Sequence, residues 1–292
     1  MVKMAFVGLG VMGYPMAGHL VKKGGHEVTV FNRSGEKAKK WVEEYGGSAA
    51  VTPREAASGA DLIMSCVGND DDIRSVVYGD IGILAGLGRD CVFVDHTTAS
   101  ADIARELDQS CRDQGAHFVD APVSGGQAGA ENGTLTVMCG GEQSAFDRAK
   151  SAMDCYGKAV TLMGEAGSGQ LTKMVNQICI AGVVQGLAEA VNIAMQAGLD
   201  TDRVVEVISK GAAQSWQMEN RWHTMSKGEF DFGFAVNWMR KDLRICLEEA
   251  RKNGAALPMT GLVDGLYQLV QQNGGGRWDT SSLLSNLTRK SS

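Results

Sequence analysis

The sequence predicts an α/β domain followed by an all-α domain, with one long helix joining the two. In the first half, short apolar strands alternate with amphipathic helices, and a glycine-rich turn follows the first strand. In the second half, helical periodicity continues without a strong strand pattern. A chain of 292 residues also exceeds the usual size of one domain. We therefore expect an α/β domain over residues 1–165 and a helical domain over residues 166–292.

The composition argues against several classes of function. With 28 basic and 34 acidic residues, the net charge of −6 disfavours binding to nucleic acid or to an anionic membrane. No apolar run is expected to reach the ~20 residues of a membrane-spanning helix, and the first residues read as a strand and not as a cleavable leader. Seven scattered cysteines without a CxxC pair indicate a reducing compartment. We expect a cytoplasmic protein with no metal site.

The first 31 residues have the pattern of a dinucleotide-binding site. Met4–Val7 form a short apolar strand, residues 14–23 have helical periodicity, and Glu27–Phe31 form a second strand. The turn between them, GLGVMG, follows the Rossmann pattern G-x-G-x-x-G, whose glycines permit a tight turn, a close approach of the pyrophosphate and packing of helix on strand. The residues expected to hold the cofactor in this turn are Gly8, Leu9, Gly10, Val11, Met12 and Gly13.

The end of the second strand predicts which dinucleotide binds. An NAD site usually has Asp or Glu there, which accepts a hydrogen bond from the ribose 2′-hydroxyl. This chain has Asn32, Arg33 and Ser34 instead. A carboxylate would repel a 2′-phosphate, whereas Arg33 can bind one with charge-assisted hydrogen bonds. We therefore expect NADP as the cofactor, with NADPH favoured over NADH.

Further strands are expected at residues 61–67, 91–95, 116–123 and 134–140, with an amphipathic helix at 101–115. In an open parallel sheet, ligands bind at the carboxyl ends of the strands. Val67, Gly68 and Thr98 follow two of these strands and are expected to contact the ribose and the nicotinamide. His96 lies beside Thr98, but no carboxylate stands in fixed register with it, so we interpret it as a pocket wall.

One lysine, Lys173, lies within the most apolar segment of the second half. A helix is expected from Gln170 to Gly198, and Lys173 lies near its start among apolar residues. Such a lysine can extend its ammonium group to water along its methylene stem, or it can be buried for a function. Shorter helices are expected at residues 201–213, 217–228, 237–252 and 259–272. An apolar helix of this length needs cover on all sides, so we expect a homodimer or homotetramer.

Four stretches in one chain resemble a known family. They are GLGVMG (8–13), DAPVSGG (120–126), GSGQLTKMVNQ (167–177) and WMRKDL (238–243). Together, in this order and at this spacing, they closely resemble the β-hydroxyacid dehydrogenase family, which includes 3-hydroxyisobutyrate dehydrogenases, tartronate semialdehyde reductases and glyoxylate/succinic semialdehyde reductases. The resemblance extends from residue 3 to about residue 285. It implies a Rossmann-type domain joined by a long helix to an all-α domain.

The resemblance also implies roles for individual residues. Lys173 matches the catalytic lysine, and Thr98 matches a Ser/Thr near the nicotinamide. Many members have Asn four residues after the lysine; here Asn176 is at +3 and Gln177 at +4, a form that resembles the tartronate semialdehyde branch. Either amide could touch substrate, because both share the lysine's helix face. The positions that match substrate-binding or closing residues of the family are Ser124, Gly125, Gly126, Phe234, Lys241 (at the cofactor) and Asp242.

The chemistry of hydride transfer supports the same residues. Delivery of a hydride to a carbonyl creates an alkoxide, which needs a proton donor within hydrogen-bond reach. Lys173 is suited to this role, because burial in an apolar pocket lowers the pKa of a lysine amine. The Ser124-Gly125-Gly126 backbone can receive a substrate carboxylate closely. We expect an NADP-dependent oxidoreductase for a small 3-hydroxyacid or its semialdehyde, similar to 3-hydroxyisobutyrate dehydrogenase; the alternative is a glyoxylate/succinic semialdehyde or tartronate semialdehyde reductase.

Three further alternatives are disfavoured by particular residues. A 6-phosphogluconate dehydrogenase is longer and has Glu seven residues after the lysine, where this chain has Ile180. Imine reductases replace the lysine, which is present here as Lys173. A catalytically inert nucleotide-binding module would lose the lysine and carry basic or additional segments, whereas this chain is acidic.

Overall fold

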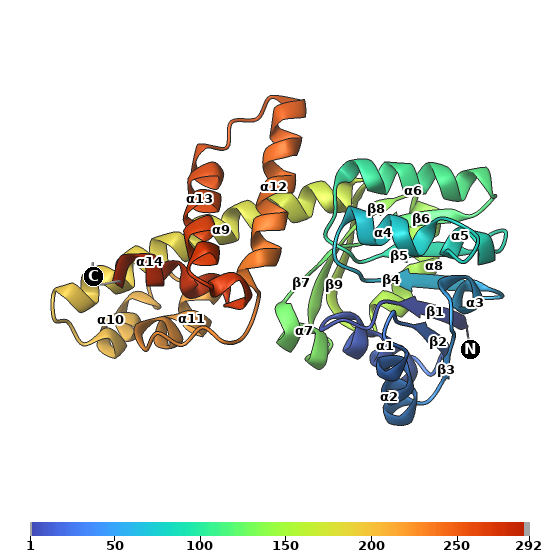
Figure 1. The fold of residues 1–292 in the computed structure, drawn as a ribbon, viewed down its shortest axis with the longest axis horizontal. Coiled ribbons are helices and arrows are strands. Elements are labelled where there is room, and N and C mark those ends of the chain that lie inside the picture. The colour runs from blue at the N-terminus through green and yellow to red at the C-terminus, as the bar shows by residue number, and fades with distance from the viewer. Residues whose placement is uncertain (1, 289–292) are drawn as a thin grey trace. The chain divides into compact units, whose positions relative to one another are not determined.

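The structure is a computed structural model that describes residues 2–288, and these form two compact units. The first unit ends at Lys173 and the second begins at Met174. The first is a sheet with helices on both faces and the second is helical, so the predicted fold class is confirmed (Figure 1).

The first unit contains the sheet. Its strands are β1 (Lys3–Val7), β2 (Glu27–Phe31), β3 (Ser48–Ala49), β4 (Leu62–Ser65), β5 (Val92–Asp95), β6 (His117–Asp120), β7 (Val123–Ser124), β8 (Leu135–Gly141) and β9 (Gly157–Gly164). They lie in the order β3-β2-β1-β4-β5-β6-β8-β7, with β9 paired to β8. The pairs from β3 to β6 are parallel, whereas β8 is antiparallel to β6 and β7.

The register of the parallel strands aligns their carboxyl ends. Val7 of β1 is opposite Ser65 of β4, Ser65 is opposite Asp95 of β5, and Asp95 is opposite Asp120 of β6. The loops that follow these four strands therefore leave the sheet along one edge. This is the edge at which open α/β sheets bind their ligands.

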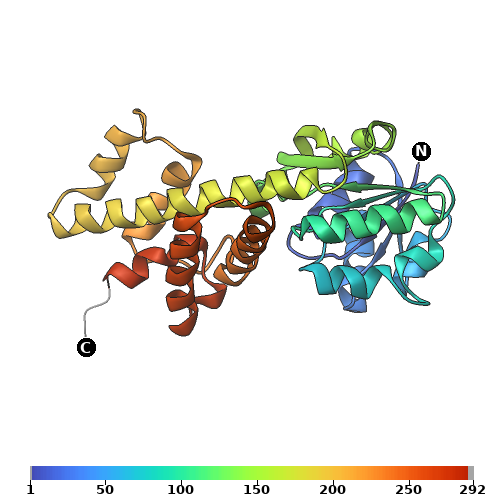
Figure 2. The same ribbon diagram turned by 90° about the horizontal axis from the view of Figure 1, so that it is seen from above.

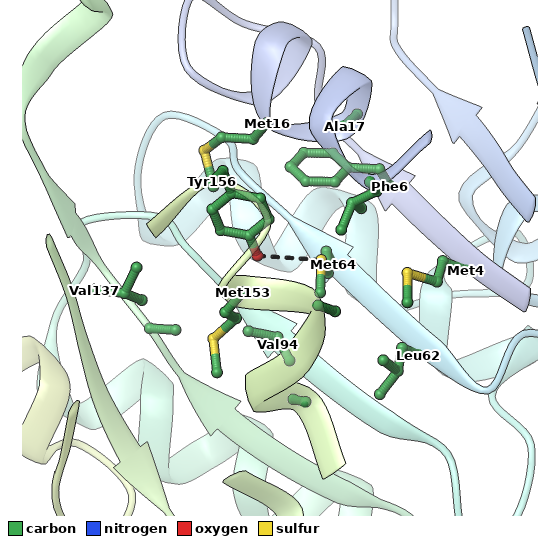
Figure 3. Packing of buried hydrophobic residues seen from close by; sticks show 14 of the residues in the cluster. Met4, Phe6, Met16, Ala17, Leu62, Met64, Val94, Val137, Met153 and Tyr156 are labelled. Atoms are coloured by element: carbon green, nitrogen blue, oxygen red, sulfur yellow. Dashed lines mark hydrogen bonds between the residues drawn. The ribbon is translucent and has the colours of Figure 1, made fainter. Parts of the chain in front are cut away.

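Helices cover both faces of this sheet (Figures 1 and 2). The helices of the first unit are α1 (Gly13–Lys22), α2 (Gly35–Tyr45), α3 (Pro53–Ala57), α4 (Asp70–Val77), α5 (Ile83–Gly86), α6 (Ala101–Asp113), α7 (Gly126–Asn132) and α8 (Gln143–Met153). Successive strand residues point to opposite faces. Met4 and Phe6 of β1 pack with α1, α2 and α8, whereas Ala5 and Val7 pack with α3, α4, α5 and α6 (Figure 3 shows the first cluster).

Two strands of this unit were not predicted, the two-residue β3 and the longer β9. β9 lies at the join between the two halves of the sequence, and most of its residues are exposed or only half buried. Val160 and Leu162 pack against the core from this strand, but they are too few to give the buried apolar run that marked β4 and β5. Its partner β8 supplies the pairing, which is not visible in the local sequence.

The second unit is helical. Its elements are α9 (Ser168–Gln196, which begins in the first unit), α10 (Thr201–Ile208), α11 (Trp216–Ser226), α12 (Val236–Asn253), α13 (Pro258–Gln272), the 3-10 turns η1 (Gly275–Arg277) and η2 (Thr280–Leu284), and α14 (Ser285–Thr288). These agree with the five expected helices. Trp222 and Tyr267 are fully buried in the core of this unit, where α9, α11, α12 and α13 pack together.

The helix α9 contradicts the expectation that no apolar segment would be long enough to span a membrane. It has 29 residues and is long and apolar enough to cross a membrane, by length and composition alone. About 33% of its most apolar window is buried inside the protein. The core helix of a globular domain meets the same criteria, so length and composition do not decide between the two.

His96 lies in the core of the first unit and not on a pocket wall, because it is 1% exposed. Its Nδ1 is 2.7 Å from the carbonyl of Ala121, so Nδ1 must donate. Nε2 therefore accepts from the hydroxyl of Tyr156, at 2.8 Å. Tyr156 Oη also lies 3.4 Å from Met64 Sδ (Figure 3). Burial lowers the pKa of His96 to about 4, although the Ala121 bond acts in the other direction.

We expect His96 to stay neutral, with its proton on Nδ1, down to about pH 5. An unfolded histidine has a pKa of 6.5 and the folded one about 4, so the stabilisation from neutral His96 is complete above pH 6.5 and is lost as the pH falls towards 4. The difference corresponds to roughly 3 kcal/mol. Histidine ¹⁵N NMR across this range measures the protonation directly. Titration of His96 near pH 6.5 would contradict the buried, neutral assignment.

Candidate active site

The turn between β1 and α1 is shaped by its glycines. Gly8 has φ +96°, and a Cβ there would lie 2.4 Å from the carbonyl oxygen of Cys66. A Cβ on Gly13 would lie 2.0 Å from the carbonyl oxygen of Gly8. A Cβ on Gly10, in contrast, would meet no atom of the described chain within 4 Å. Two glycines are therefore needed for packing, and the third leaves open space above the backbone, as a pyrophosphate requires.

Asn32 holds this glycine turn to the end of β2. Its Oδ1 accepts a hydrogen bond from the backbone N–H of Leu9 at 2.9 Å, and its Nδ2 donates to the carbonyl of Ser34 at 3.2 Å. Arg33 and Ser34, which follow, are exposed. The amide of Asn32 is thus engaged within the protein, and the next two side chains face solvent at the strand end that lies beside the turn.

The ends of β4 and β5 are joined by buried polar contacts. Asp95 Oδ1 accepts from Ser65 Oγ at 2.5 Å and from Thr97 Oγ1 at 2.8 Å. Thr97 Oγ1 accepts in turn from the N–H of Val67 at 3.0 Å. Burial raises the pKa of Asp95 to about 6, although these hydrogen bonds lower it. The network fixes the positions of the loops that contain Val67, Gly68 and Thr98.

The DAPVSGG segment continues this edge of the sheet. β6 ends at Asp120, β7 covers Val123–Ser124, and Gly125 and Gly126 have φ of +135° and +62°. Only glycine adopts both conformations at low cost. A Cβ on Gly126 would meet no atom of residues 2–288 within 4 Å. The space beside Gly126 is therefore open, whereas a Cβ on Gly125 would lie 3.0 Å from Leu135 Cδ2. A small anion could approach the N–H groups of this turn from the Gly126 side.

Lys173 lies in the second turn of α9 and is only 7% exposed. The residue as a whole is therefore largely withdrawn from solvent, including the methylene stem. Lysine is rarely buried to this degree without a partner or a function. Asn176 and Gln177 follow at i+3 and i+4 on the same helix, so all three side chains share a face.

In the second unit, Gln177 connects α9 to α12. Its Nε2 donates to Asp242 Oδ2 at 2.6 Å, and its Oε1 accepts from Asn176 Nδ2 at 2.8 Å. Lys241 Nζ lies 2.9 Å from Asp242 Oδ1, in an ion pair whose side chains are 11% and 2% exposed. Both ends of the Gln177 amide are thus engaged in a buried network. This leaves Asn176, which is half buried, as the better placed of the two amides to meet a ligand.

Phe234 lies two residues before α12, and hydrogen bonds fix its backbone. Its N–H donates to Asp279 Oδ2 at 2.9 Å, and Arg221 Nε donates to Asp279 Oδ1 at 3.0 Å. Asp279 is fully buried. A Cβ on Gly233 would lie 2.0 Å from Asp279 Oδ2, so this residue must be glycine. The network sets the backbone that carries the Phe234 ring.

The structure brings the expected residues together in two groups, one in each unit. The first is Gly8, Leu9, Gly10, Val11, Met12, Gly13, Asn32, Arg33, Ser34, Val67, Gly68, Thr98, Ser124, Gly125 and Gly126 along one sheet edge, with Lys173 at the end of that unit. The second is Asn176, Gln177, Phe234, Lys241 and Asp242. Within residues 2–288, no group of three or more His, Cys, Asp or Glu residues could hold a metal ion.

Two buried polar residues of the first unit, Asp120 and Gln170, were not among the expected site residues. Asp120 accepts hydrogen bonds from the N–H groups of Gly167 and Gln170, and Gln170 bonds the backbone on both sides of Thr98. Burial raises the pKa of Asp120 to about 7, although the two N–H groups lower it. The signal available in the sequence was a polar side chain inside each of two glycine-rich stretches.

Comparison with known proteins defines the class of this chain. Residues 3–164 match the NAD binding domain of 6-phosphogluconate dehydrogenase, and residues 167–287 match the NAD-binding domain of NADP-dependent 3-hydroxyisobutyrate dehydrogenase. An uncharacterized oxidoreductase of Shewanella frigidimarina is 61% identical over the full length of both chains. The 2-hydroxy-3-oxopropionate reductase of Escherichia coli is 33% identical, covering 98% of this chain and 97% of that protein.

Solved structures give the same result. 3-Hydroxyisobutyrate dehydrogenase of Mycobacterium tuberculosis with L-serine superposes with a TM-score of 0.89 and 28% identity, covering 99% of this chain and 100% of that one. Psf3 in complex with NADP⁺ and 2-OPP has a TM-score of 0.88 and 25% identity, covering 98% and 100%. The chain belongs to the β-hydroxyacid dehydrogenase family. It is an oxidoreductase of the 3-hydroxyisobutyrate dehydrogenase type, with nicotinamide dinucleotide-binding domains.

The glycines of the β1–α1 turn predict two separable effects. Gly10→Ala adds a methyl group to open space, so the Tm should be unchanged while dinucleotide affinity falls at least tenfold, or ~1.4 kcal/mol. Gly13→Ala forces the methyl group onto the Gly8 carbonyl and should cost about 1–3 kcal/mol of stability. Calorimetric binding and thermal melts of both variants measure this. A Gly10→Ala variant that binds the dinucleotide normally would show that the open space is not the cofactor site.

Proposed function

We propose that this protein is an NADP-dependent β-hydroxyacid dehydrogenase that interconverts a small 3-hydroxyacid and its semialdehyde, with Lys173 as the general acid and base. The observation that carries the proposal is the burial of Lys173, 7% exposed, within the motif GSGQLTKMVNQ. A surface role would leave its ammonium group in water. A buried amine at this point of the fold is suited to proton transfer.

The residues divide the chemistry between them. A bound nicotinamide dinucleotide supplies or accepts the hydride, and the β1–α1 turn with Val67, Gly68 and Thr98 would hold it. In the reduction, Lys173 donates a proton to the carbonyl oxygen as negative charge develops there; in the oxidation, it takes that proton back. Asn176 is placed one turn further along the same helix face, where its amide could orient the reacting oxygen.

The cofactor is proposed to be NADP. Asn32 is engaged with Leu9, whereas Arg33 and Ser34 are exposed at the end of β2. A guanidinium and a hydroxyl group suit a 2′-phosphate, and no carboxylate stands at these three positions to repel one. The match of the second half to a family described as NADP-dependent, and the NADP⁺ complex of Psf3, support the same cofactor.

The substrate is proposed to carry a carboxylate close to the reacting carbon. Ser124, Gly125 and Gly126 offer backbone N–H groups without side-chain bulk, a cradle for an anion and not for an apolar group. A tartronate semialdehyde reductase is the second candidate, since residues 173–177 have the KxxNQ form and the 2-hydroxy-3-oxopropionate reductase is a relative. Turnover of 3-hydroxyisobutyrate, glyoxylate, succinic semialdehyde, tartronate semialdehyde and L-serine separates the candidates, with isobutanol as the carboxylate-free control.

The protein is further proposed to be a cytoplasmic homodimer or homotetramer. Val175, Val183 and Ile193 lie on one side of α9 and are exposed by 62%, 38% and 69%. Apolar residues that are exposed along one side of a helix can mark a surface that another protein covers. A second copy of the chain is the cover that we propose; neither nucleic acid nor an anionic membrane surface suits the net charge of −6.

Lys173→Ala should retain the fold and bind NADPH normally, because the β1–α1 turn is unchanged, but should lose about 10²–10⁴-fold in kcat. Lys173→Arg should fail as well, because a guanidinium does not release a proton near neutral pH. Steady-state kinetics, NADPH binding and a circular dichroism melt of both variants test this. An arginine variant with near-normal kcat would mean that a positive charge is sufficient and that Lys173 transfers no proton.

NADPH should be preferred over NADH in kcat/KM. Arg33→Asp should reverse the order, by weakening NADPH through charge repulsion and by offering NADH a ribose partner; each tenfold change corresponds to ~1.4 kcal/mol. Lys39→Asp is a matched control, since Lys39 lies on the exposed side of α2 in an ion pair with Glu36. A wild-type enzyme that uses NADH at least as well would refute the assignment of this strand end.

A further inference from the structure

The side chain of Gln170 binds the backbone on both sides of Thr98. Its Oε1 accepts from the N–H of Ala99 at 3.0 Å, and its Nε2 donates to the carbonyl of Thr97 at 2.7 Å. Gln170, Thr97 and Ala99 are each 1% exposed. The amide therefore pairs with the loop after β5 as another peptide group would, and both of its polar ends are satisfied.

This pairing holds both neighbours of Thr98. Its two neighbours are buried and held, whereas Thr98 itself is half exposed. Thr98 follows β5 at the edge where the carboxyl ends of β1, β4, β5 and β6 are aligned. The position of this residue is thus set from α9, which lies more than 70 residues away in sequence.

The same turn of α9 is anchored a second time. Asp120 Oδ1 accepts from the N–H of Gly167 at 2.7 Å, and Oδ2 accepts from the N–H of Gln170 at 2.8 Å. A Cβ on Gly169 would lie 2.7 Å from Asp120 Oδ2, and one on Gly140 would lie 2.5 Å from Oδ1. The two glycines allow the carboxylate this close approach to the start of the helix, where negative charge is favourable.

We propose that Gln170 is a positioning residue for the hydride and proton transfer: it ties the loop of Thr98 to the helical turn that carries Lys173. Lys173 follows Gln170 by three residues, which is about 4.5 Å of helical rise. The Gln170 amide thereby sets the distance between the residue expected at the nicotinamide and the amine expected at the reacting oxygen. This proposal rests on the proposed function of Lys173. It adds the contact that keeps Thr98 and Lys173 at a fixed distance from each other.

The energetic reason is the steep dependence of such transfers on geometry. A displacement of 1 Å at the reacting atoms can cost about 10²-fold in rate, while cofactor affinity depends on many contacts elsewhere. Loss of either hydrogen bond between the Gln170 side chain and the backbone of residues 97–99 would let this loop move relative to α9. The cofactor would still be held at the β1–α1 turn, and binding would change less than the rate of transfer.

The experiment uses Gln170→Glu in the full-length enzyme. The carboxylate has the same size and can still accept from Ala99, but it cannot donate to the Thr97 carbonyl. We expect kcat to fall 10–100-fold, the primary deuterium isotope effect on kcat to increase, and the Kd for NADPH to change less than threefold. Gln170→Asn, which keeps the amide but shortens it, should move the same quantities in the same direction and serves if the first variant does not fold.

The matched control is Gln185→Glu on the same helix, where Gln185 Nε2 donates to Glu189 Oε1 at 2.7 Å. It makes the same chemical change and should leave kcat and the isotope effect unchanged. If the Gln170 variants lose only thermal stability, or lose NADPH affinity in proportion to kcat with no change in isotope effect, Gln170 does not position the transfer. The proposed function itself is judged separately, by the Lys173 variants.

Discussion

The first turn of α9 is held by a buried carboxylate, and the rest of the site depends on that contact. Asp120, at the end of β6, accepts from the backbone N–H groups of Gly167 and Gln170. This places the start of α9 against the edge where the parallel strands end, and Lys173 follows one turn later. Without the anchor, neither the burial of Lys173 nor the pairing of Gln170 with the loop of Thr98 would be fixed by local structure.

Buried acids are costly unless hydrogen bonds compensate them, and the first unit provides these bonds from its backbone and hydroxyl groups. Asp95 receives two hydroxyl groups and Asp120 two backbone N–H groups, yet burial still raises the pKa of these acids to about 6 and about 7. Both carboxyl groups end strands at the edge where open α/β sheets bind their ligands. These two buried acids therefore reduce the folding stability of the chain while they fix the loops around them, as polar groups at functional sites in enzymes commonly do.

The sequence predicted those strands, helices and motifs that depend on residues close together in the chain. β2 begins at Glu27 and ends at Phe31 as expected, since its apolar run and the glycines around it are local signals. The edge strand β9 has no buried apolar run that would mark it in the sequence, and the core position of His96 depends on Tyr156, which lies 60 residues away. The same holds in the site. The motifs indicated Lys173, but the pairing of Gln170 with Thr97 spans 73 residues and becomes visible only in the fold.

The most direct test of the account is a crystal structure of the enzyme with NADP⁺ and a bound 3-hydroxyacid. We predict that Lys173 Nζ lies within ~3.2 Å of the substrate hydroxyl oxygen, the distance that proton transfer requires. We also predict the carboxylate of the substrate on the backbone of Ser124, Gly125 and Gly126. A complex in which the hydroxyl oxygen is held by another side chain, with Nζ directed away from it, would contradict the central role of Lys173.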